Sequence, residues 1–170
     1  NFCFFHKDTF FYPAKDLLFY SADVHSQAIT CQRFCVLHKY LSGEKPFVVL
    51  SVEALLDKMT PKDIFSSFVI ELKQGDVVDS KQLLQKLILM GYERTDLVEA
   101  PGQFAVRGGI LDIYSPTAEQ IFRIEFWDNE IDSIRTVNIN TQCSTEKINE
   151  ISIFPMRELV YTNELAQIAI

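Results

Sequence analysis

The pattern of hydrophobic positions changes at Gly91. Before it, apolar residues recur at spacings of three and four, most clearly over His25–Leu41. This spacing places them on one face of a helix, and Gly43 is typical of the residue just beyond a helix C-terminus. A second helix is predicted between Asp79 and Gly91, because Asp79 followed three residues later by Gln82 is a capping-box pattern.

In the first third of the chain, short apolar runs alternate with helical segments. Leu17–Tyr20 and Phe47–Leu50 have strand character, and helices are predicted after them over His25–Leu41 and Val52–Met59. The order strand, helix, strand, helix is typical of a βαβ unit with parallel strands. Two such strands are too few for a complete sheet, so we expect this part to be the edge of a larger α/β domain.

After Gly91, apolar and polar residues alternate with the period of a β-strand. The predicted strands cover residues 94–98, 103–107, 110–114, 121–127, 130–138 and 148–154, and a strand over residues 68–72 precedes the second helix. Ile131 and Ile134 break the strict alternation of their strand, which predicts a β-bulge. The sequence therefore predicts the α/β class, with an antiparallel meander that carries one helix.

Gly108–Gly109 joins two of these strands in a predicted two-residue hairpin, because primed turns need a positive φ at one or both positions. The register then sets Arg107 opposite Ile110 and Ala105 opposite Asp112. On one face lie the apolar residues expected in the core, which are Phe104, Val106, Leu111 and Ile113. The outer face displays Gln103, Arg107, Ile110, Asp112 and Tyr114. Such residues are found both on solvated sheet faces and on protein interfaces, and this pattern alone leaves both open.

Composition narrows the functional classes. The 170 residues include 16 Lys and Arg against 23 Asp and Glu, which gives a net charge of -7. Proteins that bind DNA through its phosphates normally carry a basic face, so we do not expect direct nucleic-acid binding. The four cysteines are too few and too scattered for a disulfide scaffold. No apolar run approaches the roughly 18 residues that span a membrane. A cytoplasmic protein is expected, and a chain that opens at Asn1 without Met suggests an excised fragment.

No motif predicts catalysis, a metal site or a cofactor within these residues. The chain lacks the Gly-x-x-x-x-Gly-Lys-Ser/Thr loop that would hold ATP phosphates. Cys31, Cys35 and His38 share one face of a predicted helix, where they are either metal ligands or side chains of the apolar stripe. The acidic residues Asp128, Glu130 and Asp132 form either a weak metal site or a solvated hairpin tip.

Two longer motifs carry a resemblance to a known family. The runs Gly102–Tyr114 and Arg123–Arg135 resemble the signature shared by bacterial nucleotide excision repair proteins. Both belong to the UvrB-like N-terminal module of the transcription-repair coupling factors and of the excinuclease subunit UvrB. Further segments look like the coupling factors rather than UvrB, and these are Tyr12–Tyr20, Ala22–His25, Gln32–Arg33 and Ser51–Leu56.

The resemblance implies a fold in two parts. Residues 1–65 with 145–170 are expected to be the remnant of a UvrB-like, P-loop-like α/β domain. Residues 66–144 are expected to be an inserted mixed sheet-plus-helix domain that interacts with UvrA. The alternatives are a fragment of the UvrB excinuclease subunit and a fragment of an unrelated α/β hydrolase.

The resemblance also implies a protein-interaction role. In this family the inserted domain docks the damage sensor UvrA, and the coupling factor uses it to recruit repair to stalled RNA polymerase. The family's interface arginines fall on Arg94 and Arg107, and we add Ile110 and Asp112 from the outer face of the hairpin. UvrB has a further arginine where this chain has Ala105, so that contact is absent or replaced. ATP and Mg, DNA and RNA polymerase are expected to bind other domains of the parent protein.

Overall fold

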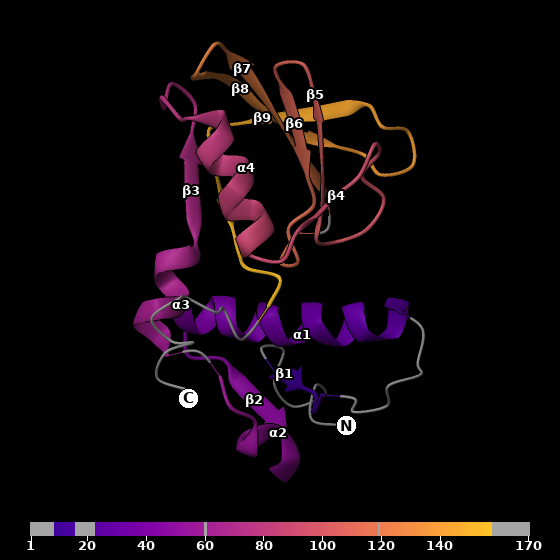
Figure 1. Cartoon of the computed structure of the whole chain (residues 1–170). Coiled ribbons are helices and arrows are strands. Elements are labelled where there is room, and N and C mark those ends of the chain that lie inside the picture. The colour runs from indigo at the N-terminus through magenta and orange to yellow at the C-terminus, as the bar shows by residue number, and fades with distance from the viewer. Residues whose placement is uncertain (1–8, 16–22, 60, 119, 158–170) are drawn as a thin grey trace. The chain divides into compact units, whose positions relative to one another are not determined.

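The computed structural model describes residues 9–15, 23–59, 61–118 and 120–157. Contacts between residues divide the chain into two units, Asn1–Lys58 and Met59–Ile170 (Figure 1). None of the described helices combines the length and the apolar character that crossing a membrane requires.

The first unit contains β1 (Thr9–Tyr12), α1 (Asp23–Leu41), β2 (Phe47–Leu50) and α2 (Val52–Leu56). β1 and β2 pair in parallel, as predicted for a βαβ unit. The first strand is Thr9–Tyr12, however, and the predicted strand Leu17–Tyr20 lies outside the described residues. α2 ends before the predicted Met59, because Asp57 already has an extended backbone. The core of this unit consists of Tyr12, Val36 and Ala54.

A buried arginine joins three segments of this first unit. The Arg33 side chain is 1 % exposed, and its Nη1 donates to the Pro13 carbonyl at 2.6 Å. The same nitrogen lies 2.9 Å from the Asp57 carboxylate, and the guanidinium lies 4.1 Å from the centroid of the Tyr12 ring. A buried charge needs such partners, because desolvation without them costs several kcal/mol, on the order of 3–5.

The second unit is built on a sheet of six strands in the order β4 (Glu93–Arg94), β5 (Gln103–Arg107), β6 (Ile110–Ile113), β7 (Ile121–Trp127), β8 (Glu130–Val137) and β9 (Ser144–Ile148). β4 and β5 are parallel, and every later neighbour pair is antiparallel. This confirms the α/β class and the antiparallel meander. Of the predicted strand over residues 94–98, only Arg94 lies in a strand, the two-residue β4.

One face of the six-stranded sheet is covered by α4 (Ser80–Leu89) (Figure 1) and by the antiparallel pair of β3 (Ile70–Lys73) and β10 (Glu150–Ile153). The buried side chains between them include Leu72, Leu83, Leu87, Phe104, Leu111, Ile113, Ile124, Ile131, Ile134, Ile151 and Ile153. A short helix, α3 (Lys62–Phe68), precedes β3 and was not predicted. We call this covered side the core face of the sheet, and the opposite side the outer face.

Local signals placed α4 and the bulge correctly. Asp79 Oδ1 accepts hydrogen bonds from the backbone N–H groups of Lys81 and Gln82, at 2.8 and 3.2 Å. Gly91 follows the helix at a φ of 93°, which favours glycine. In the β7–β8 pair the register shifts around Asp132, so that Ile131 and Ile134 both point into the core.

The structure groups the C-terminal strands differently from the predicted partition, in which residues 145–170 join residues 1–65. β9 pairs with β8, and β10 pairs with β3, so residues 144–153 lie in the second unit. The single predicted strand over 148–154 is two strands separated at Asn149. The reason is burial, because Ile151 and Ile153 pair with Leu72 and Ile70 inside the core of the second unit. Residues 158–170 lie outside the described part.

Candidate partner-binding site

The predicted hairpin forms with the predicted register. Arg107 pairs with Ile110 and Ala105 with Asp112, and Tyr114 N donates to the Gln103 carbonyl at 3.0 Å. Gly108 has a φ of 61°, which is the positive value that a primed turn requires at its first central position. The two glycines therefore fix which side chains of β5 and β6 reach the outer face.

Gly109 has a separate role at the same turn. Its carbonyl accepts a hydrogen bond of 2.7 Å from Phe126 N, which continues the ladder between β6 and β7. A Cβ atom at this position would lie 2.9 Å from the Phe126 carbonyl oxygen. Because that neighbour is backbone, any larger residue has to push the turn away from β7.

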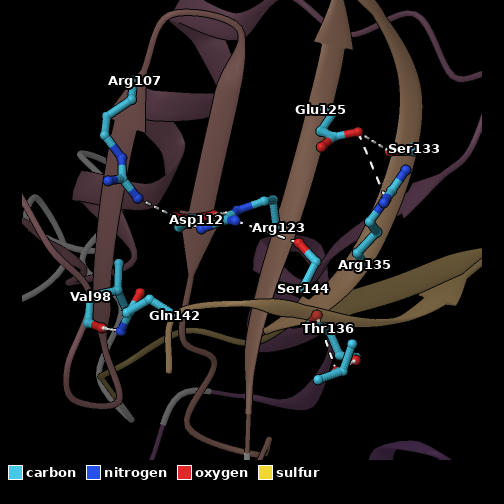
Figure 2. A network of polar contacts seen from close by, with 11 residues as sticks. Val98, Arg107, Asp112, Arg123, Glu125, Ser133, Arg135, Thr136, Gln142 and Ser144 are labelled. Atoms are coloured by element: carbon cyan, nitrogen blue, oxygen red, sulfur yellow. Dashed lines mark hydrogen bonds and ion pairs between the residues drawn. The ribbon is translucent and has the colours of Figure 1, made fainter. Parts of the chain in front are cut away.

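Asp112 is the centre of a polar network on the outer face (Figure 2). Arg123 binds it with both sides of its fork, Nε to Oδ1 at 2.7 Å and Nη2 to Oδ2 at 2.9 Å. Arg107 Nη2 donates to the same Oδ2 at 2.9 Å. Charge-assisted, bidentate bonds of this kind are among the strongest in proteins. The hydrogen bond from Asp112 is the main reason that the pKa of Arg123 is raised above its ordinary value.

The network changes the role predicted for Asp112. Its side chain is only 3 % exposed, whereas the Arg107 side chain is 53 % exposed. The hairpin pattern alone had suggested that Asp112 is displayed to a partner. Instead, its carboxylate is buried and already accepts hydrogen bonds from two arginines. Asp112 instead positions Arg107, whose outward end remains accessible.

Arg123 is the member of this network that sequence reasoning missed. It pairs with Asp112 across β6 and β7, and its side chain is 16 % exposed. The signal was present, because alternation along β7 places Arg123 on the outer face beside the hairpin. The sequence does not give the lateral register between β6 and β7, because the seven residues 114–120 separate these two strands.

Ala105 occupies the position where the resemblance to UvrB implies another arginine. It is buried in a small apolar cluster on the outer face, with Val98, Tyr114, Ile121 and Val137. Tyr114 belongs to this cluster, so it is not displayed to solvent as the hairpin pattern suggested. The outer face thus has an apolar part around Ala105 and a charged part around Asp112.

Arg94 and Arg107 do not point to the same side of the sheet. Arg94 pairs with Phe104, a core-face residue, whereas Arg107 lies three residues further along β5 and therefore on the outer face. Arg94 is exposed at the edge strand β4. Ile110 is half-buried, between Arg107 and Glu125 in the ladder. The structure therefore brings Arg107, Ile110 and Asp112 together and leaves Arg94 apart.

Within the described residues, no group of three or more His, Cys, Asp or Glu side chains is arranged to hold a metal ion. Cys31 and Cys35 are half-buried in α1, and burial raises the pKa of Cys31 to about 11. Burial is also the main reason that the pKa of His38 is lowered. The partial burial of both cysteines along α1 fits side chains that pack on one face of the helix.

The profile of a known domain family, described as the UvrB interaction domain, matches residues 70–159. This range contains β3, α4, the whole six-stranded sheet and β10. The chain belongs to the UvrB interaction domain family. In this UvrB interaction domain, the polar network around Asp112 joins β5, β6 and β7 through charged contacts.

Two curated relatives of this chain are named transcription-repair-coupling factors. The chain is 37 % identical over 158 residues to the transcription-repair-coupling factor of Bacillus subtilis. The aligned residues cover 93 % of this chain and 13 % of the relative. The chain is 33 % identical over 162 residues to the factor of the same name from Staphylococcus haemolyticus, which covers 95 % of this chain and 14 % of the relative. The chain thus spans about one seventh of the length of these relatives.

Proposed function

We propose that this chain is the UvrA-binding module of a transcription-repair coupling factor, and that it binds UvrA through the outer face of the β5–β6 hairpin. The family match and the names of the relatives support this assignment. The contact would be made by Arg107, with Ile110 as an apolar neighbour. Arg94 pairs with the core-face residue Phe104 at the sheet edge, so it would lie outside this contact.

The observation that carries the proposal is the state of the Arg107 side chain. The side chain is about half exposed, yet its Nη2 donates a hydrogen bond to the buried Asp112 carboxylate, which holds the guanidinium in place. A side chain held in place before binding loses less conformational entropy when a partner arrives. Arginine is also the residue type that binds carboxylates with two parallel hydrogen bonds, and it is common among interface residues that dominate affinity. We therefore expect an acidic side chain of UvrA at this position.

The role in the parent protein follows from the same family. The module would recruit UvrA to RNA polymerase stalled at DNA damage, in the bacterial cytoplasm. ATP and Mg binding, ATP hydrolysis and DNA translocation would belong to parts of the parent outside these 170 residues, as would the contacts with RNA polymerase and DNA. The chain itself would act as a binding module without a cofactor.

The test is a titration of the purified chain with UvrA. Arg107→Ala is expected to weaken binding at least about tenfold, because truncating a central charged contact commonly costs 2 kcal/mol or more. The melting temperature should change little, since an exposed arginine contributes little to folding. Lys81→Ala is the matched control, because Lys81 is an exposed cation on α4, on the other side of the sheet.

Three outcomes are distinct. Loss of affinity in Arg107→Ala alone supports the hairpin site. Wild-type affinity in Arg107→Ala removes this hairpin contact, and an Arg94→Ala variant then tests the sheet edge by itself. No binding of the wild-type chain to UvrA would contradict the assigned partner.

A further inference from the structure

A row of cations crosses the outer face of the six-stranded sheet beyond the hairpin. Asp112 pairs with Arg123, Arg123 with Arg135, and Arg135 with Lys147, so the row runs over β6, β7, β8 and β9. Residues that pair across neighbouring strands point to the same face. Arg123, Arg135 and Lys147 are therefore side by side on the face that also carries Arg107.

This row of neighbouring cations does not favour the stability of the folded sheet. Like charges directly opposite each other on neighbouring strands destabilise a sheet. Asp112 offsets the charge of Arg123 with its two bonds. The charge of Arg135 is offset much less, because its Nε lies 3.9 Å from Glu125 Oε2, an oxygen that also accepts from the Ser133 hydroxyl (Figure 2).

The row also departs from the composition of the chain. Glu130 lies on the same face further along β8, opposite Trp127. Around Asp112 and Arg123, however, the outer face brings together four cations and two carboxylates, although the chain carries a net charge of -7. These are Arg107, Arg123, Arg135 and Lys147, with Asp112 and Glu125. Arg135 has a side chain that is 45 % exposed, and Lys147 is exposed. Places where a sequence breaks a local folding rule are often functional sites.

We propose that Arg135 and Lys147 extend the UvrA contact from the hairpin across β8 and β9, where they bind acidic side chains of UvrA. This inference rests on the proposed function. Continuity supports it, because Arg107 and Arg123 share the Asp112 carboxylate and Arg123 adjoins Arg135. A surface that spans several strands also suits a protein partner of ordinary interface size.

Acidic side chains fit this surface better than nucleic-acid phosphates do. Glu125 lies among the cations and is partly exposed. A phosphate backbone would meet this carboxylate and the overall negative charge of the chain, whereas a protein surface can place a donor opposite Glu125. The exposed cations of the row would mainly steer the encounter and fix its orientation.

The experiment compares two double variants of the chain in UvrA titrations at low and at physiological salt. Arg135→Glu with Lys147→Glu reverses the row, and we expect affinity to fall about tenfold at low salt, with a smaller loss at higher salt. Lys62→Glu with Lys81→Glu makes the same change of charge on exposed positions of α3 and α4, and should match the wild type closely. Thermal unfolding checks that both double variants fold. If the variant with Arg135→Glu and Lys147→Glu does not fold, the single variant Lys147→Glu replaces it in the titrations.

The outcomes separate this inference from the proposed function. If Arg107→Ala weakens binding and the reversed row does not, the row is no part of the contact and the hairpin site stands. If both double variants lose affinity equally, the loss reflects net charge and the row is again excluded. If Arg107→Ala binds normally while the reversed row does not, the proposed hairpin contact fails and the row stands. Binding of duplex DNA by the wild type that the reversed row abolishes would overturn the assignment to protein carboxylates.

Discussion

On the core face of the six-stranded sheet, most side chains of β5 to β8 are apolar and are buried or partly buried beneath α4, β3 and β10. On the outer face, alternate residues of the same strands form one apolar cluster around Ala105 and one charged network around Asp112. Both faces share the same backbone and the same hydrogen-bond ladders. The comparison shows how the period of two along a strand lets one sheet support a core and a binding surface separately.

The two faces should respond differently to substitution. Removing a core-face side chain leaves a cavity in a closely packed interior, so its cost appears in the free energy of unfolding. Removing an outer-face cation leaves solvent in its place, so its cost appears in the affinity for a partner. The comparison is tested most directly by measuring both stability and affinity for substitutions on each face.

The largest effect is expected for Ile124→Ala. Ile124 lies on β7 and is fully buried, in the same core cluster as residues of α4, β3 and β10. The variant should lose about 2–5 kcal/mol of unfolding free energy in urea, while the folded fraction binds UvrA with unchanged affinity. The control is Ile110→Ala, because Ile110 is half-buried on the outer face. This variant should lose about 1 kcal/mol of unfolding free energy or less. Equal losses in both variants would show that the faces are not energetically distinct.

Ala105→Arg should also destabilise the chain, although the resemblance to UvrB implies an arginine at this position. Ala105 is 2 % exposed and packs in the cluster with Val98, Tyr114, Ile121 and Val137. A larger, charged side chain must disrupt this packing, with an expected loss of about 3 kcal/mol by chemical denaturation. Tighter UvrA binding with unchanged stability would show instead that the cluster opens to accommodate the arginine.

Asp112→Asn is expected to affect both stability and binding, but through Arg107. The substitution keeps the shape of the side chain and removes the charge that holds Arg107 and Arg123. We expect about 2 kcal/mol less stability and several-fold weaker UvrA binding. A double-mutant cycle tests the mechanism, because the binding loss should vanish in an Arg107→Ala background. An equal loss in both backgrounds would mean that Asp112 contacts UvrA by another route.

Elements governed by local chemistry were predictable from the sequence. The helical spacing over His25–Leu41, the Asp79 cap and the Gly108–Gly109 turn each depend on residues close together in the chain. For the same reason the register of the β5–β6 hairpin was correct, since a two-residue turn leaves no freedom in the pairing. The alternation of that hairpin determined which residues lie on the outer face, Arg107 and Asp112 among them.

Tertiary structure alone decided which of those outer-face residues a partner can reach. Asp112 is buried because Arg123 arrives from β7, and Ala105 is buried because Val98 and Val137 arrive from other segments. Arg94 lies apart from Arg107 because of its pairing with Phe104, and β10 joins β3 across more than 70 residues. Such contacts depend on lateral register and on burial between distant segments, and the period of a single strand holds no information about either.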